Sequence, residues 1–272
     1  MTGPAGEEEK DPAAGRYGRD LFTPTHPLEA DRIDYGAQAY DPWTRSRLRA
    51  LGVGPGWRCL DVGAGTGTVA RWLLDEAHVD EVVALDQDTR HLAPLAGPRL
   101  HPRTADLRDP GLDPGTFDLV HARFVLMHLP ERRHLLSRLA NWLAPGGWLV
   151  VSDAVEVPNA LDSSSAYRRT MDAMWQALND TIGTDIASVP SYPRFLREEG
   201  LTDVAADLYC PPLTPGAAVT AFWLETWQRL RGALETTGRV DAETVDQALA
   251  YLSSPDLAEL PPGMLTAWGR RR

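Results

Sequence analysis

An acidic residue and three alternating glycines stand at the end of an apolar segment, in Leu60-Asp61-Val62-Gly63-Ala64-Gly65-Thr66-Gly67-Thr68. Glycine tolerates positive φ and has no Cβ, so Gly63 and Gly65 let the backbone turn tightly and pass close beneath a ligand. Gly67 lets the next helix lie against a sheet. The pattern predicts a strand that turns into a helix at the binding site of an adenosine-containing cofactor.

The spacing of these glycines differs from that of a dinucleotide site. Such a site needs G-x-G-x-x-G, whose last glycine would stand at Thr68, whereas the spacing here is G-x-G-x-G. A nicotinamide-dependent reductase would also need a catalytic Tyr-x-x-x-Lys or its equivalent. The sequence has neither feature, so a reductase is the weaker alternative.

Two further acids follow the glycines at informative distances. Asp86 ends the apolar segment 81–86, about 20 residues after the glycines, where a carboxylate can reach a ribose diol. The segment 103–107 reads as a third strand, whose Asp106 can accept a hydrogen bond from an adenine amino group, with Leu107 beside the ring. The structural alternatives are a helix N-cap for Asp86 and a turn acid for Asp106.

The segments 117–123 and 146–153 supply a fourth and a fifth strand, and the alternation of strands and helices is typical of an α/β sheet. As a set, the five segments resemble the motifs of class I S-adenosylmethionine-dependent methyltransferases over residues 45–153. The resemblance implies a Rossmann-like, seven-stranded, mostly parallel sheet with helices on both faces. It also implies that S-adenosyl-L-methionine is the cofactor and S-adenosyl-L-homocysteine the product.

The same resemblance implies a set of cofactor-binding residues along these motifs: Asp61, Gly63, Ala64, Gly65, Asp86, Gln87, Asp106, Leu107 and Ala122. In such a site the glycine loop contacts the methionine part of the cofactor. Asp61 orients that loop and the cofactor's amino group, and Asp86 binds the ribose. The backbone around Ala122 closes the pocket.

Composition limits the class of acceptor. The formal net charge of −11 over 272 residues argues against a nucleic-acid substrate, which needs basic stripes. No run of about 18 apolar residues predicts a membrane span. The N-terminus lacks the pattern of a secretory signal, and two cysteines are too few for a disulfide framework, which favours a cytoplasmic enzyme. The expected partner is therefore a small-molecule acceptor.

Catalytic candidates stand just beyond two strand ends. His128, after the fourth strand, has the right type for a general base, as does His121, and Glu156 follows the fifth strand. A packing or capping role for His128 and a solvated loop position for Glu156 are the alternatives. No spacing of His, Asp or Glu residues predicts a metal site.

Three helical patterns in the second half of the chain predict a cap over the sheet. One covers 163–179, and the others, 217–234 and 241–252, separate strands six and seven, at 204–209 and 264–269. Apolar and aromatic side chains on these helices are the predicted substrate-binding residues: Met171, Trp175, Phe222 and Trp223. The alternative is that the first helix is simply a core helix.

The N-terminal residues 1–40 read as an acidic tail followed by a lid, in which Tyr17 is the candidate side chain for covering the cofactor. Asp41 and Pro42 then predict a helix start, with the Asp as N-cap. This divides the chain into 1–40, a cofactor-binding core over 41–155, and remaining strands with cap insertions over 156–272. The N-terminal segment or the cap is also a candidate contact for a homo-oligomer.

The whole chain resembles small-molecule tailoring methyltransferases of actinobacterial natural-product biosynthesis. The resemblance implies methyl transfer at carbon or oxygen of an apolar aromatic, terpenoid or alkaloid acceptor. A cofactor-dependent cyclase and a non-catalytic cofactor-binding protein would keep every motif named above. Those two possibilities stay open at this point.

Overall fold

A computed structural model describes residues 21–157 and 164–272, apart from residue 24. It contains one seven-stranded sheet in the order β3-β2-β1-β4-β5-β7-β6. The strands run over β1 Arg58–Val62, β2 Glu81–Asp86, β3 Leu100–Thr104, β4 Phe117–Arg123, β5 Leu143–Val155, β6 Thr202–Tyr209 and β7 Gly263–Arg270. Only β7 runs antiparallel to its neighbours β5 and β6, which confirms the predicted fold class for the described residues.

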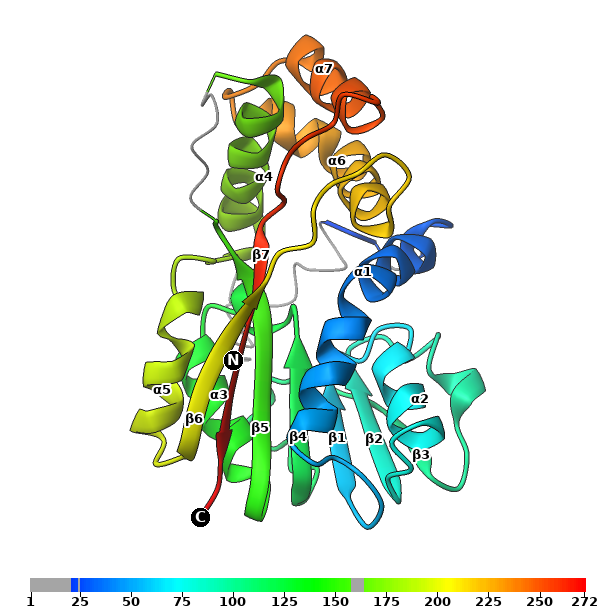
Figure 1. Ribbon diagram of the computed structural model, residues 1–272, viewed down its shortest axis with the longest axis vertical. Helices are drawn as coiled ribbons and strands as arrows, with labels where there is room; N and C mark the ends of the chain where they lie inside the picture. The colour runs from blue at the N-terminus through cyan, green and yellow to red at the C-terminus, as the bar shows by residue number, and fades with distance from the viewer. Residues whose placement is uncertain (1–20, 24, 158–163) are drawn as a thin grey trace, which may run out of the picture.

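Helices cover both faces of this sheet (Figure 1). They are α1 Glu29–Ala50, α2 Thr68–Asp75, α3 Arg132–Asn141, α4 Ala166–Ile182, α5 Tyr192–Glu198, α6 Ala218–Thr236 and α7 Ala242–Leu252, with short 3₁₀ turns η1 Ala93–Leu95, η2 Leu126–His128 and η3 Val189–Ser191. Successive side chains of a strand point to opposite faces. On β1, Leu60 and Val62 therefore pack toward α3 and α5, whereas Cys59 packs toward α1 and α2.

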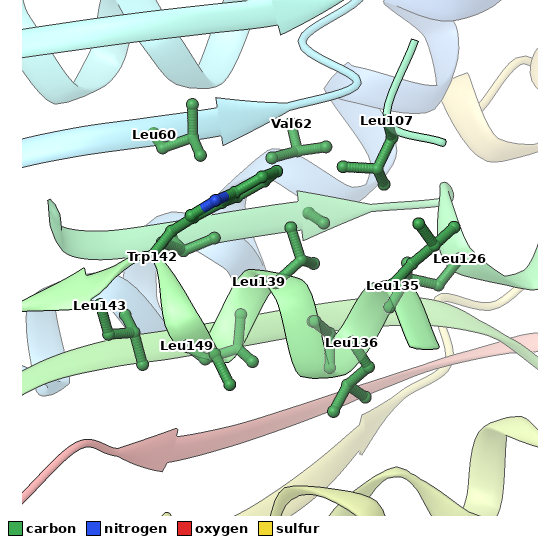
Figure 2. Close-up of a cluster of buried hydrophobic side chains, with 14 of the residues drawn as sticks. Leu60, Val62, Leu107, Leu126, Leu135, Leu136, Leu139, Trp142, Leu143 and Leu149 are labelled. Carbon is green, nitrogen blue, oxygen red and sulfur yellow. The ribbon is translucent and has the colours of Figure 1, made fainter. Parts of the chain in front are cut away.

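Figure 2 shows the first of these cores, in which leucines of α3 lie against the sheet. Leu135 and Leu139 of α3 are 1% and 0% exposed, and they belong to one cluster with Leu60 of β1 and Leu149 of β5. Burial of a leucine side chain is worth about 1.5–3 kcal/mol. This packing fixes β1 and β4 side by side, so that their carboxyl ends form one rigid edge.

The helices α4, α6 and α7 form a cap beyond the carboxyl end of the sheet (Figure 1). Their shared core contains Met174 of α4, Trp227 and Leu230 of α6 and Val245 of α7, each 1% exposed or less. The two helices predicted between strands six and seven are thus present. They pack on α4, as the sequence predicts.

One predicted boundary is wrong. Helix α1 begins at Glu29 and continues through Pro42, so Asp41 is not its N-cap. The carboxylate of Asp41 is buried and accepts hydrogen bonds from Arg123 at 2.6 Å and from Arg45 at 3.0 Å. Packing of α1 against both the sheet and the cap outweighs the backbone hydrogen bond that the proline removes.

The third strand is also displaced from its predicted position. It occupies Leu100–Thr104 rather than 103–107, so Asp106 lies in the turn beyond the strand. The predicted lid residue Tyr17 lies outside the described residues. Over the described residues, none of the helices has the length and apolar character that a membrane span requires.

Candidate functional site

A cavity of about 340 Å³ lies where the carboxyl ends of β1, β2 and β4 meet the cap. Its walls come from the glycine loop after β1, the N-terminal half of α1, the turn after β4, and the inner faces of α4 and α6. Ligands of open α/β sheets bind at this edge. The sheet therefore bounds one end of the cavity, and the cap bounds the other end.

The glycine loop needs its glycines for two separate reasons. Gly63, Gly65 and Gly67 have φ values of +66°, +57° and +79°. Residues with a Cβ adopt such backbone angles only with strain. A Cβ built on Gly63 would also lie 2.3 Å from Cγ2 of Val125. The backbone N–H of Gly63 donates to the carbonyl of Leu85 at 2.8 Å, which ties the loop to β2.

Asp86 ends β2 beside this loop, as predicted. One carboxylate oxygen accepts the backbone N–H of Gly65 at 2.8 Å and the other accepts that of Asp88 at 3.0 Å. Burial raises the pKa of Asp86 above its usual value, while the hydrogen bonds from Asp88 and Gly65 oppose that rise. Asp86 and Gln87 both line the cavity, so a carboxylate and an amide stand where the ribose binds in the predicted site.

We expect Asp86→Ala to weaken binding of S-adenosylmethionine by about 10- to 150-fold, because a hydrogen bond to a charged group contributes about 1.5–3 kcal/mol. Isothermal calorimetry measures this directly. Asp246→Ala, on the exposed face of α7, is the matched control and should bind like the wild type. Unchanged affinity in Asp86→Ala would remove the ribose assignment.

Of the two predicted adenine contacts, Leu107 and Asp106, only Leu107 lines the cavity. Leu107 and Ala105 line the cavity, whereas Asp106 is not part of its wall. The carboxylate of Asp106 is bound by the Arg108 side chain at 2.6 Å and by the Arg108 backbone N–H at 2.9 Å. The Arg108 side chain holds the pKa of Asp106 below its usual value. This is the geometry of a turn acid, and an adenine contact by Asp106 stays a prediction.

Asp61 and His121 face each other at the cavity wall, from neighbouring positions on β1 and β4. The Nδ1 atom of His121 lies 2.7 Å from the Asp61 carboxylate. Ala122 itself is buried, and the residues on either side of it, His121 and Arg123, line the cavity. A closing of the cofactor pocket by the backbone around Ala122 stays a prediction.

Aromatic side chains dominate the cap end of the cavity. Trp223 of α6 lies edge-on to Trp175 of α4 at 6.3 Å between ring centroids and to Phe222 at 5.1 Å. These three predicted substrate-binding residues all line the cavity. Met171 does not: it lines a small second cavity, whereas Met174, about one helical turn further on, lines the main cavity.

Sequence reasoning missed two aromatic residues in the same wall, Tyr40 and Phe124, whereas a third, Phe22, lies in the segment predicted to cover the pocket. The Tyr40 and Phe124 rings meet edge-on at 5.1 Å, and Tyr40 is 2% exposed. Ile33, Ala37 and Tyr40 line the cavity from one face of α1. Their helical spacing was a usable signal, but the helix start inferred at Asp41 excluded them.

The two catalytic candidates differ in position. His128 lines the cavity, and its Nδ1 atom lies 2.8 Å from the hydroxyl of Thr184. Burial lowers the pKa of His128 to about 3, and the positive charges of Arg32 and Arg132 add to that effect. The imidazole therefore stays neutral, and with so low a pKa it is a weak general base.

Glu156 is not brought to the main cavity. It follows the end of β5, is half exposed, and forms an ion pair with Arg168 of α4 at the small second cavity. That arrangement corresponds to a surface acid held by the cap. Over the described residues, no group of three or more His, Cys, Asp or Glu side chains is placed to hold a metal ion.

Several known proteins are similar to this chain in sequence or in fold. The family described as "Methyltransferase domain" matches residues 35–206. The methyltransferase str3 of Strobilurus tenacellus is 32% identical over 125 residues, which are 46% of this chain and 45% of the relative. A trans-aconitate 2-methyltransferase of Mycobacterium tuberculosis is 28% identical over 199 residues, 65% of this chain and 74% of the relative.

Among solved structures, phosphoethanolamine N-methyltransferase 2 of Haemonchus contortus, in complex with phosphomonomethylethanolamine and S-adenosylhomocysteine, is similar in fold. The TM-score is 0.52 at 19% identity, covering 84% of this chain and 52% of that chain. The chain spans about half of the length of the curated relatives it matches first, at 45% and 58%.

Proposed function

The chain belongs to the family of S-adenosylmethionine-dependent methyltransferase domains, and from that premise we propose that it methylates a small, largely apolar acceptor. The acceptor has an aromatic, terpenoid or alkaloid skeleton and takes the methyl group at carbon or oxygen. One observation carries the proposal: a single cavity is lined at one end by Gly63, Gly65 and Asp86 and at the other by Trp175 and Trp223.

The residues of the sheet end fit the cofactor. Gly63 and Gly65 line the cavity without side chains of their own, so a ligand there can lie close to the backbone. Asp61 and Asp86 offer carboxylates to an ammonium group and to ribose hydroxyls. When bound, the cofactor supplies an electrophilic methyl group on a sulfonium. The protein's share of the work is to orient the acceptor and to exclude water.

The aromatic wall formed by Trp175, Phe222 and Trp223 is suited to orienting the acceptor and excluding water. Trp175, Phe222 and Trp223 present apolar faces that favour a flat or terpenoid skeleton and that stabilise positive charge during transfer. Because burial lowers the pKa of His128 to about 3, its neutral imidazole is only a weak base near neutral pH. This supports an electron-rich carbon or an acidic oxygen as the methylated atom, rather than an aliphatic alcohol that needs deprotonation.

Turnover of a panel of indoles, phenols and aminoglycosides with isotopically labelled cofactor tests the proposal. We expect labelled product from indoles or phenols and none from aminoglycosides, because Trp175, Phe222 and Trp223 present mainly apolar surface at the cap end of the cavity. Turnover confined to aminoglycosides would contradict the apolar acceptor. Conversion of an acceptor without formation of S-adenosylhomocysteine would instead identify a cyclase.

A further inference from the structure

Asp153 of β5 carries a buried carboxylate that the reaction proposed above does not use. The residue is 1% exposed. Its Oδ2 atom accepts a hydrogen bond from the backbone N–H of Met127 at 3.1 Å and another from the hydroxyl of Tyr192 at 2.6 Å. Burying a carboxylate costs free energy, and hydrogen bonds to its ionised form offset part of that cost. The carboxylate therefore ties two separate segments of the chain to β5.

One of these segments is the turn after β4, residues 124–129, which we call the β4 turn. Within it, Phe124 and Met127 line the main cavity. A Cβ built on Gly63 would lie 2.3 Å from Cγ2 of Val125, so the same turn packs closely on the glycine loop. A shift of the β4 turn therefore changes the distance between the acceptor end and the cofactor end of the cavity.

Two consecutive residues of β5 hold the β4 turn. The N–H of Phe124 donates to the carbonyl of Ser152 at 2.7 Å, and the N–H of Met127 donates to Asp153. Any residue at position 152 supplies the first bond, because the acceptor is a backbone carbonyl. The second bond depends on the side chain at position 153. Tyr192, at the start of α5, donates to the same oxygen and so orients the carboxylate.

We propose that Asp153, oriented by Tyr192, is a positioning residue for methyl transfer, because its ionised carboxylate holds the β4 turn between the acceptor and the cofactor. Neither side chain belongs to the wall of the main cavity, so both act through the turn. Reacting atoms must lie about 3–3.5 Å apart and in line, so a small shift of the turn lowers kcat. This inference rests on the proposed methyl transfer.

Protonation of Asp153 weakens this hold. Burial raises the pKa of Asp153 to about 7, whereas the hydrogen bonds from Tyr192 and Met127 and the charge of Arg132 oppose that rise. Charge-assisted hydrogen bonds are roughly twice as strong as neutral ones, so both bonds to Oδ2 weaken as the pH falls through this range. The titratable and charged side chains on α5, α3, the loop after α4 and η2, which pack around Asp153, are Tyr192, Arg132, Asp185 and His128.

Asp153→Asn tests the role of the charge, because the amide keeps the shape of the side chain and stays neutral. At about pH 8 we expect kcat to fall about 10-fold, as for a small displacement of the acceptor. At about pH 6 wild-type Asp153 is itself protonated, so the two proteins should agree within about twofold. The substrate is the indole or phenol that the panel described above identifies.

The thermal stability of the same two proteins separates positioning from a merely structural role. Folding raises the pKa of Asp153, so its ionised form costs stability at high pH and that cost disappears on acidification. The melting temperature of the wild type, relative to Asp153→Asn, should therefore rise between about pH 8 and about pH 6. Over the same range its advantage in kcat should disappear. A structural role would make stability and turnover change together.

Tyr192→Phe keeps the test falsifiable if Asp153→Asn fails to fold. The variant retains the ring and removes the donor that favours the ionised carboxylate. The acid limb of the kcat profile should then move to higher pH by about one unit or more, as for a lost hydrogen bond to a charged group. Tyr167→Phe is the matched control, since its buried hydroxyl donates to the carbonyl of Leu260 instead, and its acid limb should not move.

Hydrogen–deuterium exchange reads the hold on the β4 turn without an acceptor. At one pH, peptides that cover residues 124–129 should exchange about threefold faster or more in Asp153→Asn than in the wild type. Peptides of α7 should exchange equally in the two proteins. Unchanged exchange of the β4 turn, an equal loss of kcat at both pH values, or an unmoved acid limb in Tyr192→Phe overturns the positioning role. If no member of the panel is methylated, the proposed acceptor is contradicted, and the exchange rate still decides whether Asp153 holds the turn.

Discussion

Trp227→Ala is expected to lower the free energy of unfolding by about 3–5 kcal/mol, the usual cost of truncating a large buried aromatic side chain. Trp227 is 0% exposed at the centre of the cap, and its ring lies 5.4 Å from that of Tyr167 on α4. Its removal leaves a cavity between α4 and α6. Urea denaturation followed by circular dichroism measures the loss.

A surface leucine supplies the control for this experiment. Leu208→Ala on β6 removes a side chain that is 51% exposed, and we expect a change within about 0.5 kcal/mol. If Trp227→Ala costs no more than that control, the cap is not held together by the core described here. A separate, earlier unfolding transition in Trp227→Ala would show that the cap unfolds independently of the sheet.

Gly63→Ala is expected to destabilise the protein by about 2–5 kcal/mol and to abolish detectable cofactor binding. A left-handed conformation costs an alanine about 1–2 kcal/mol, and overpacking adds about 1–3 kcal/mol. Both terms apply, because φ is +66° and the new methyl group would lie 2.3 Å from the Val125 side chain. Thermal unfolding and calorimetry with S-adenosylhomocysteine follow the two effects.

Another glycine of the chain provides a control that has the left-handed backbone conformation but not the side-chain clash. Gly52 has φ +83° with nothing within 4 Å of an added Cβ, so Gly52→Ala should show the backbone cost alone. The double variant Gly63→Ala/Val125→Ala should recover part of the loss by removing the clash. Equal destabilisation of Gly52→Ala and Gly63→Ala, with no recovery in the double variant, would contradict the close approach of Val125.

The sequence predicted those parts of the fold and site that depend on short-range spacing. Strand β4 lies at the predicted residues, and Gly63, Gly65 and Asp86 line the cavity as expected, because one strand, turn and helix position them. The predicted position of strand β3 was wrong because Leu100–Thr104 is an edge strand that contains Pro102 and in which only Leu100 is buried. Nothing in its pattern alternates clearly.

The cap end of the site was harder to predict, for a different reason. Helix α4 is buried on more than one side, so its apolar stripe does not reveal which residues face the ligand. Trp175 lines both the main cavity and the small second cavity, whereas Met171, one turn earlier on the same face of α4, lines only the second. Phe124 reaches the wall only through the positive φ of +56° in the turn after β4, which no residue spacing encodes.

Helix α1 joins the sheet and the cap in one continuous rod (Figure 1). Ile33 and Tyr40 in its first half line the cavity below α6, and Leu48 in its second half is buried against the sheet. Pro42 stands between these halves and has no N–H to donate. The helix therefore lacks one backbone hydrogen bond there and bends most easily at that point. Bending at Pro42 would move Ile33 and Tyr40 away from α6 and widen the cavity, while Leu48 stays packed against the sheet.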